Sequence, residues 1–202
     1  TDLKINHHFL FNTLNSMASM ALDCDAMNLY QSIVDLSKMF HYTLRTQSSV
    51  VPLQKEIEYV KAYLQLQKLR YEDDLEISLD INSESQMALV PFNFLQPVVE
   101  NVFSHGFKDC IKKKIALKTE VKEERLVIQV TNSGQKLSEE KIRSINYGIR
   151  SNTSHGLSMV YQKLQVFCKE DFEFRITTLH NGNTCFCIDI PFQMQQGERS
   201  YL

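Results

Sequence analysis

Neither glycine nor proline occurs between Thr1 and Val51, and this absence limits most strongly what the chain can fold into. Both residues disfavour the helix interior, so the segment is free to be helical. Its apolar residues recur at three- and four-residue steps and are interrupted at Asp23–Asp25. We predict helices from about Leu3 to Leu22 and from about Ala26 to Arg45, with Asp25 capping the second.

The residue pattern changes after the pair Asp73–Asp74. A third helix is predicted from about Leu53 to Arg70, with Pro52 at its first position. Leu75–Ile81 then alternates apolar and polar residues, as a half-buried strand does. Helices and strands follow in mixed order: helices at Pro91–Phe107 and Ser158–Lys169, and strands at Lys114–Val121, Leu126–Asn132, Phe172–Leu179 and Thr184–Ile190. Ser138–Lys141 is typical of a helix cap followed by an acidic first turn. This order predicts an α+β fold with helices on one face of a sheet.

Composition excludes some classes of function. Of the 202 residues, 43% are hydrophobic, which is ample for a packed core. The net charge of −2 argues against a nucleic-acid-binding domain.

The five cysteines are scattered, so no disulfide framework or metal site is indicated. Cys185 and Cys187 share one face of a predicted strand as buried, reduced thiols, and reduced thiols are typical of a cytoplasmic protein. No apolar run approaches the ~20 residues that cross a bilayer.

The first predicted helix carries the first chemical motif. At helical spacing His8, Phe11, Asn12 and Asn15 share one side, where a reactive imidazole would face solvent. Periodicity alone fits a core helix with incidental polar residues equally well. The ordered run His-Phe-Leu-Phe-Asn at residues 8–12 resembles the phosphoacceptor motif of the LytS-like bacterial sensor histidine kinases. The resemblance implies that His8 is autophosphorylated.

The resemblance continues along the chain, from about Leu3 to Phe192. Residues 51–59 and 63–71 match further motifs of the same kinases. It implies that residues 1–73 are a helical dimerisation and phosphoacceptor region, whose hairpin pairs with a second copy as a four-helix bundle. A monomeric helical bundle is the alternative. Residues 74–202 are implied to be a catalytic domain of the GHKL type, a Bergerat-type α/β sandwich with a mixed sheet that binds ATP.

Residues 95–106 resemble the N box of this ATPase fold. The resemblance implies that Asn101 ligates Mg²⁺ through its side-chain oxygen, which suits a hard cation that prefers oxygen ligands. Glu100 would orient a metal-bound water or assist proton transfer, and His105, one helical turn after Asn101, would reach a phosphate. Taken singly, each of these residues has an ordinary interpretation as an exposed or helix-end residue.

The first glycine-containing element departs from the family pattern. Members of the family carry Asp-x-Gly-x-Gly, whose Asp accepts a hydrogen bond from the adenine amino group. Here Asn132 replaces the Asp, Gly134 is retained, and Lys136 replaces the second glycine. The Asn132 carbonyl can still accept that bond but without charge assistance, which predicts a loss on the order of 1 kcal/mol or more in ATP affinity.

The second glycine element is also partly retained. Where the family reads Gly-x-Gly-Leu before a helix, this chain has Ser154 in place of the first glycine, while Gly156 and Leu157 match. Glycine lets the backbone approach the phosphates at a helix N-terminus. The segment from Lys136 to Ser154 would form the lid over the nucleotide.

Together these motifs imply a sensor histidine kinase of a two-component system. His8 would take a phosphoryl group from ATP–Mg²⁺ and pass it to an aspartate in the receiver domain of a response regulator. No acidic residue follows His8, so Asn12, one turn on, would orient the ring; His7 points about 100° away. The homodimer would be the cytoplasmic part of a membrane sensor, anchored by an upstream segment.

Two other functions remain open at this stage. The substitutions at Asn132 and Ser154 also fit a degenerate pseudokinase, or a dimeric scaffold that docks a response regulator without phosphorylating itself. A protein-serine kinase of the same ATPase fold is disfavoured because that class needs no histidine-bearing hairpin.

Overall fold

The structure is a computed structural model, and it describes residues 7–107, 110–134, 136–153 and 155–194, without the side chains of Arg45 and His155. The described residues form two compact units. The first contains the chain up to Gln47 together with Glu58–Glu72, and the second contains Ser48–Ile57 and the chain from Asp73 onward. The functional division at residues 73 and 74 stays a prediction.

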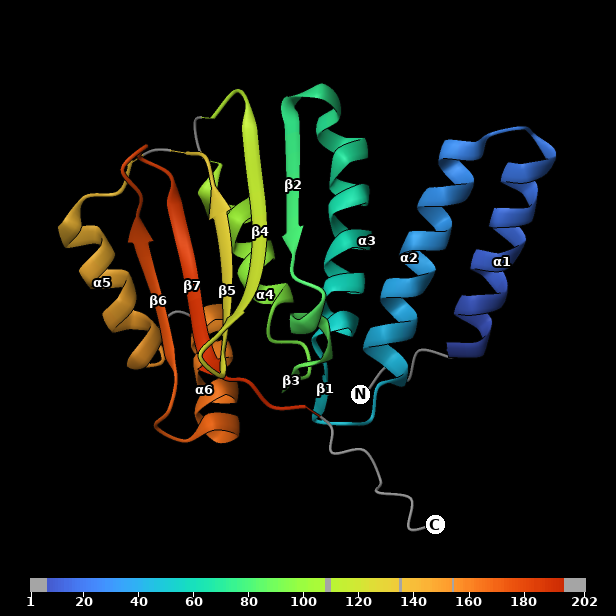
Figure 1. Ribbon diagram of the computed structural model, residues 1–202. Coiled ribbons are helices and arrows are strands. Elements are labelled where there is room, and N and C mark those ends of the chain that lie inside the picture. Colours follow the sequence, from blue (N-terminus) through green and yellow to red (C-terminus); the bar gives the residue numbers. More distant parts are fainter. Residues whose placement is uncertain (1–6, 108–109, 135, 154, 195–202) are drawn as a thin grey trace, which may run out of the picture. The chain divides into compact units, whose positions relative to one another are not determined.

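The first unit is helical, as the absence of glycine and proline predicted. Helices α1 (His7–Asp23) and α2 (Met27–Arg45) form a hairpin, and the unit also holds most of α3 (Leu53–Tyr71) (Figure 1). Between α1 and α2 the ring of Phe11 packs 5.4 Å from that of His41. The predicted Asp25 cap is wrong: Asp25 takes a positive φ of 54° in the turn, and no side chain caps α2. No helix in the described part of the chain is long and apolar enough to cross a bilayer.

The second unit is built on a five-stranded sheet in the order β2-β4-β5-β7-β6. Strand β2 runs parallel to β4 and the other neighbours are antiparallel, so the sheet is mixed. The strands are β2 (Leu75–Ile81), β4 (Lys113–Lys122), β5 (Arg125–Asn132), β6 (Glu173–Thr178) and β7 (Thr184–Pro191).

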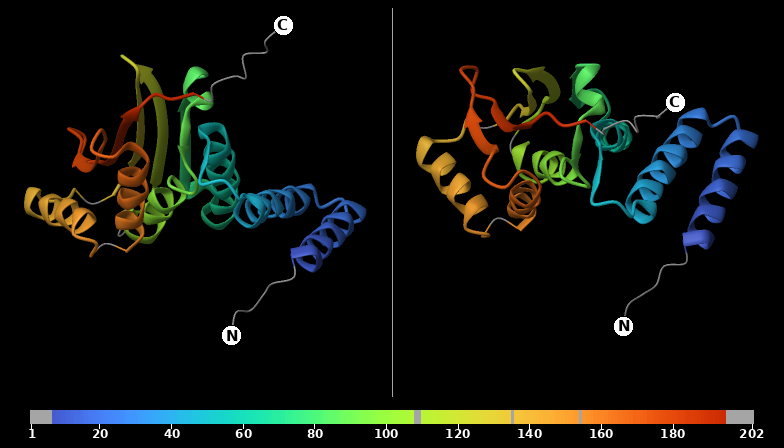
Figure 2. Two further views of the ribbon diagram at one scale, coloured as in Figure 1. Left: turned by 90° about the horizontal axis from the view of Figure 1, so that it is seen from below. Right: turned by 60° about the horizontal axis from the view of Figure 1, so that its bottom comes forward.

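Helices cover one face of this sheet (Figures 1 and 2). They are α4 (Gln96–Asn101), α5 (Glu139–Arg150) and α6 (His155–Cys168). Alternate residues of β5 supply the core beneath them, with Leu126, Ile128 and Val130 buried and their neighbours half-buried, as a period of two requires. The predicted α+β fold with a mixed sheet is confirmed.

A small second sheet was not predicted. Strands β1 (Val50–Pro52) and β3 (Leu89–Pro91) pair antiparallel, and the N–H of Leu53 continues the pairing to Ala88 O at 2.8 Å. Each strand ends in a proline, which the sequence analysis had placed in the following helix. Two-stranded pairing tolerates proline at an edge. The helix predicted from Pro91 therefore begins later, as α4, and continues as the π-helical turn η3 (Val102–Gly106).

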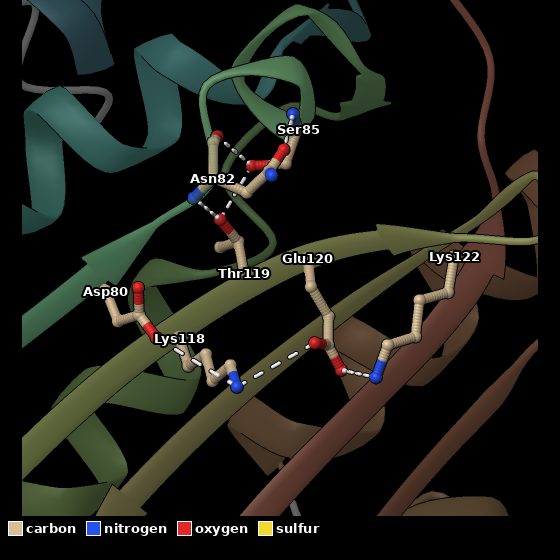
Figure 3. A network of polar contacts seen from close by, with 7 residues as sticks. All are labelled: Asp80, Asn82, Ser85, Lys118, Thr119, Glu120 and Lys122. Carbon is tan, nitrogen blue, oxygen red and sulfur yellow. Dashed lines mark hydrogen bonds and ion pairs between the residues drawn. The ribbon is translucent and has the colours of Figure 1, made fainter.

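The connection from β2 to β3 is held by a hydrogen bond between two buried hydroxyl groups (Figure 3). The short turn η1 (Glu72–Asp74) precedes strand β2, and the turn η2 (Glu84–Met87) follows it. In η2, Ser85 Oγ lies 2.6 Å from Thr119 Oγ1 of β4. Both side chains are buried. The neighbouring ion pairs of Lys118 with Asp80 and Glu120 have N–O distances of 4.0 and 3.7 Å. Lys118 and Asp80 are exposed and Glu120 is half-buried, so these pairs contribute little to stability.

Helix α5 is attached to the edge strand β6. Ser138 caps it, as predicted, by accepting the N–H of Lys141 at 3.2 Å. The Asn146 side chain then pairs with both backbone groups of Ile176, donating to its oxygen at 2.9 Å and accepting from its nitrogen at 2.8 Å. The segment predicted as a lid thus contains a helix that is hydrogen-bonded to the sheet. Ser154 lies outside the described residues.

Candidate functional site

His8 lies exposed at the second position of α1. Asn12 follows one helical turn later, and its Nδ2 lies 3.2 Å from Nδ1 of the His8 ring. The side of the helix predicted to carry His8, Phe11, Asn12 and Asn15 is divided: Phe11 is buried towards α2, whereas the three polar residues are exposed. The geometry therefore joins His8 and Asn12 and leaves the imidazole accessible.

The contact between His8 and Asn12 can serve either tautomer of the neutral ring. With Asn12 Nδ2 facing the ring, Nδ1 accepts the hydrogen bond, and the tautomer that allows this carries its proton on Nε2. A half-turn of the Asn12 amide would present Oδ1 to a protonated Nδ1 instead. Nε2 would then carry a free lone pair that points to solvent. Because the Asn12 side chain is exposed, the packing leaves room for this rotation.

In the second unit the predicted N box forms one continuous helical segment, α4 followed by η3. Glu100 is half-buried, and its Oε1 accepts a hydrogen bond from Gln96 Nε2 at 2.6 Å. Asn101 is half-buried too, and its side chain has no hydrogen-bond partner among the described residues. His105 is exposed within the π-helical turn. A π-helical turn inside a helix often marks a functional position.

The two glycine elements lie at opposite ends of this segment. At its C-terminal end, Gly134 packs so tightly on the carbonyl oxygen of Gly106 that an added Cβ would overlap it, and its φ of +155° is unfavourable for other residues. At the N-terminal end, Gly156 in the first turn of α6 lies against Pro97; a Cβ there would be 3.8 Å from the proline Cβ. Leu157 is buried beside it. The fold thus places both glycine elements against the helical segment formed by α4 and η3.

Asn132, at the end of β5, is only 1% exposed. Its Nδ2 donates to Gly106 O at 3.3 Å and to Ser133 O at 2.8 Å. Its Oδ1 is buried and has no partner among the described residues. An unpaired buried acceptor is costly, so this oxygen suits a ligand that donates a hydrogen bond. The donor of an adenine amino group has the required chemistry.

The sequence analysis did not single out the residues that hold the start of α4. The buried carboxylate of Glu56, in the first turn of α3, accepts the N–H groups of residues 93–95 at 2.5, 3.1 and 3.0 Å. Lys163 of α6 donates to the carbonyls of Phe92 and Asn93 at 2.8 Å each. Burial lowers the pKa of Lys163, and the charge of Glu56 opposes that shift. Periodicity gave no signal for either residue; Glu56 merely lay inside a stretch that resembles the family.

The chain is similar to a protein-family model and to curated proteins. Residues 2–75 match the family model described as histidine kinase. The sensor protein kinase HptS of Staphylococcus aureus strain USA300 is 27% identical over 189 residues, which cover 91% of this chain and 36% of HptS. HptS of strain NCTC 8325 matches to the same extent. The chain thus spans about a third of the length of these curated relatives. Its resemblance to the LytS-like sensor histidine kinases is confirmed.

Solved histidine kinase structures share the fold. The catalytic domain of ThkA superposes with a TM-score of 0.57 at 14% identity, covering 74% of this chain and 100% of that domain. Full-length ShkA, in complex with AMPPNP, gives 0.56 at 13% identity, covering 94% of this chain and 45% of ShkA. AdeS of Acinetobacter baumannii gives 0.52 at 12% identity, with coverages of 93% and 96%. The sandwich of the second unit is therefore the histidine kinase catalytic fold.

Proposed function

We propose that this chain is the kinase part of a two-component sensor, in which His8 accepts the γ-phosphoryl group of ATP. The observation that carries the proposal is the exposed His8 ring, paired with Asn12 inside the segment that matches the histidine kinase family model. An exposed ring on a rigid helix, oriented by a neighbour, is what a nucleophile of this kind needs. The comparisons give no support to the pseudokinase alternative.

ATP would bind along the segment formed by α4 and η3, with its base at Asn132 and its phosphates towards Asn101 and the start of α6. Two observations support this fit: the unpaired Oδ1 of Asn132, and the Asn101 amide without a described partner. Gly156 and Leu157 begin a helix of 14 residues, whose N-terminus favours anions.

Mg²⁺, when bound, would neutralise charge on the phosphates, and Asn101 is the residue that would hold it. No cluster of three or more His, Cys, Asp or Glu among the described residues could hold a metal ion by itself. A magnesium ion here would therefore take most of its ligands from phosphate oxygens and water. Glu100 would orient one such water, and His105 would approach a phosphate from the η3 turn.

In the transfer step the Nε2 lone pair of His8 attacks the γ-phosphorus in line, and the bond to the bridging oxygen of ADP breaks. This requires the Nδ1-protonated ring, which Asn12 Oδ1 stabilises after the half-turn of its amide. The phosphorylated ring then releases its Nδ1 proton to water. An aspartate of a receiver domain would subsequently take the phosphoryl group.

We also propose that the first unit dimerises. Large apolar side chains are exposed on α1 and α2: Phe9, Met17, Met20, Met27 and Leu29 are between 50% and 70% exposed. Such a surface on a helical hairpin is typical of a bundle that is completed by a second copy. The dimer would be the cytoplasmic part of a membrane-anchored sensor, with a response regulator as its partner.

The test is incubation of the purified chain with Mg²⁺ and γ-labelled ATP. We expect label on the wild-type chain and on a His7→Gln variant, and none on His8→Gln. Calorimetry with ATP and Mg²⁺ should show binding to wild type and to His8→Gln, but at least tenfold weaker binding to Asn101→Ala. Absence of binding at millimolar ATP would contradict the proposal and support a non-enzymatic scaffold.

A further inference from the structure

Gln96 is the first residue of α4, and its side chain contacts Glu100, which lies one helical turn further on. Gln96 Nε2 donates to Glu100 Oε1 at 2.6 Å. The Oε1 atom of Gln96 is buried and has no partner among the described residues. Glu100 Oε2 also has no hydrogen-bond partner in the described part of the chain. The contact thus leaves one oxygen of each side chain unpaired.

The unpaired oxygen of Gln96 is a consequence of the contact with Glu100. A carboxylate only accepts hydrogen bonds, so a half-turn of the Gln96 amide would set two oxygens against each other. The amide is therefore held with Nε2 on Glu100 and with Oε1 in the interior. A buried acceptor without a partner lowers stability, and an apolar side chain of the same length would avoid that loss. Stability of the fold does not explain why glutamine is present here.

The pair lies next to the side of α4 that faces the start of α6. Pro97 marks that side, because a Cβ on Gly156 would lie 3.8 Å from the proline Cβ. Asn101 follows Pro97 by one helical turn and so lies on the same side of the helix. Glu100 precedes Asn101 directly, about 100° round the helix. The carboxylate that Gln96 holds therefore belongs to the neighbour of the residue proposed to hold Mg²⁺.

We propose that Gln96 is a positioning residue: by holding Oε1 of Glu100 it fixes the direction of Oε2, with which Glu100 orients a water bound to Mg²⁺. This rests on the proposed function and deepens it. A glutamate side chain has several rotatable bonds, and ordering them when a ligand binds costs conformational entropy. Gln96 orders the carboxylate before the ligand arrives, so that binding no longer carries this cost. The unpaired Oε1 of Gln96 is the loss of stability that accompanies this order.

The experiment is a double-mutant cycle on the full chain. Gln96→Met keeps the length of the side chain but cannot donate, and it is compared with Glu100→Gln and with the double variant. Calorimetry measures the affinity for ATP with Mg²⁺ and with EDTA, and the ratio of the two affinities reports the contribution of the metal. Gln165→Met makes the same chemical change on the exposed surface of α6 and serves as the matched control.

We expect Gln96→Met to reduce the ratio roughly threefold to tenfold, through the affinity with Mg²⁺ alone. Glu100→Gln should reduce it at least as much. The double variant should reduce it no further than Glu100→Gln does, because Gln96 acts only through Glu100. Without nucleotide, Gln96→Met should melt at or above the temperature of wild type, since it removes a buried acceptor that has no partner. Gln165→Met should leave the ratio unchanged.

The contrary results are distinct from one another. An unchanged ratio in Gln96→Met, or a double variant in which the two single effects multiply, would overturn the positioning role. A structural role would replace it if Gln96→Met melted more than about 4 °C below wild type, or lost ATP affinity equally with Mg²⁺ and with EDTA. If wild type bound no ATP, the proposed function would fail together with this inference. If wild type bound ATP but its ratio did not respond to Gln96→Met, the inference alone would fail.

Discussion

The two asparagines of the candidate site have opposite surroundings. Asn12 is exposed and contacts His8, four residues away on the same helix. Asn132 is buried and contacts Gly106, 26 residues away on another element. The first contact comes from helix geometry alone, whereas the second exists only when the sheet and η3 have packed together. Substitutions around Asn12 should therefore change chemistry without changing stability, and substitutions around Asn132 should change both.

The largest effect should come from Gly134→Ala. The added Cβ would overlap Gly106 O, and the alanine backbone would have to keep an unfavourable φ. We therefore expect a loss of more than about 3 kcal/mol in the free energy of unfolding. Gly156→Ala is the matched control, because its Cβ would make only an ordinary contact with Pro97 at 3.8 Å. Urea unfolding measures both. Similar stabilities for the two variants would contradict the tight packing at Gly106.

Glu56→Gln should have the next largest effect. Glutamine keeps one acceptor oxygen but places an NH₂ group against at least one of the three N–H groups that precede α4. We expect a loss of about 2–3 kcal/mol in the free energy of unfolding, since backbone donors in a buried place lose their partner. Glu84→Gln, on the exposed surface of η2, should leave the free energy of unfolding unchanged. An unchanged free energy of unfolding in Glu56→Gln would show that the start of α4 does not need the carboxylate.

A smaller effect should appear at high pH through the thiols. Burial raises the pKa of Cys168 from 9.0 to about 11, whereas Cys24 is exposed. The folded state therefore holds the Cys168 proton between these values while the unfolded state loses it. This contribution is constant below pH 9 and decreases stability by up to about 2 kcal/mol as the pH rises to 11. The free energy of unfolding, measured against pH, should fall less steeply in Cys168→Ala than in wild type, and as steeply as in wild type in Cys24→Ala. Identical slopes for the two variants would refute a raised pKa of Cys168.

The smallest change in stability is expected for Asn12→Ala, within about 0.5 kcal/mol, because the side chain is exposed. The rate of His8 phosphorylation should nevertheless fall roughly tenfold to a hundredfold, since the ring loses its orientation. Asn12→Asp retains an acceptor for Nδ1–H and should keep most of the rate. Quench-flow labelling with ATP measures both variants. If alanine and aspartate behaved alike, ring orientation by this residue would be excluded.

What the sequence predicted follows the same contrast. Features set by local periodicity were predictable. They are the helices α1 and α2, the contact between His8 and Asn12, strand β2 at Leu75–Ile81, and the Ser138 cap. Contacts between distant segments were not. The carboxylate of Glu56 beneath residues 93–95 and the strands β1 and β3 have no periodic signal, because each depends on groups far away in the chain. Family resemblance pointed to Asn132 as a candidate nucleotide-binding residue but gave no hint that its amide binds Gly106.

The central claim is that a nucleotide held along α4 and η3 phosphorylates one particular imidazole. The most direct measurement is tandem mass spectrometry, under non-acidic conditions, of the chain after incubation with ATP and Mg²⁺. We predict one phosphoryl group on His8, accompanied by an equal amount of ADP, and none after the same treatment of Asn101→Ala. A phosphoryl group on His7 or any other residue, or one that persists on His8 in Asn101→Ala, would contradict the account.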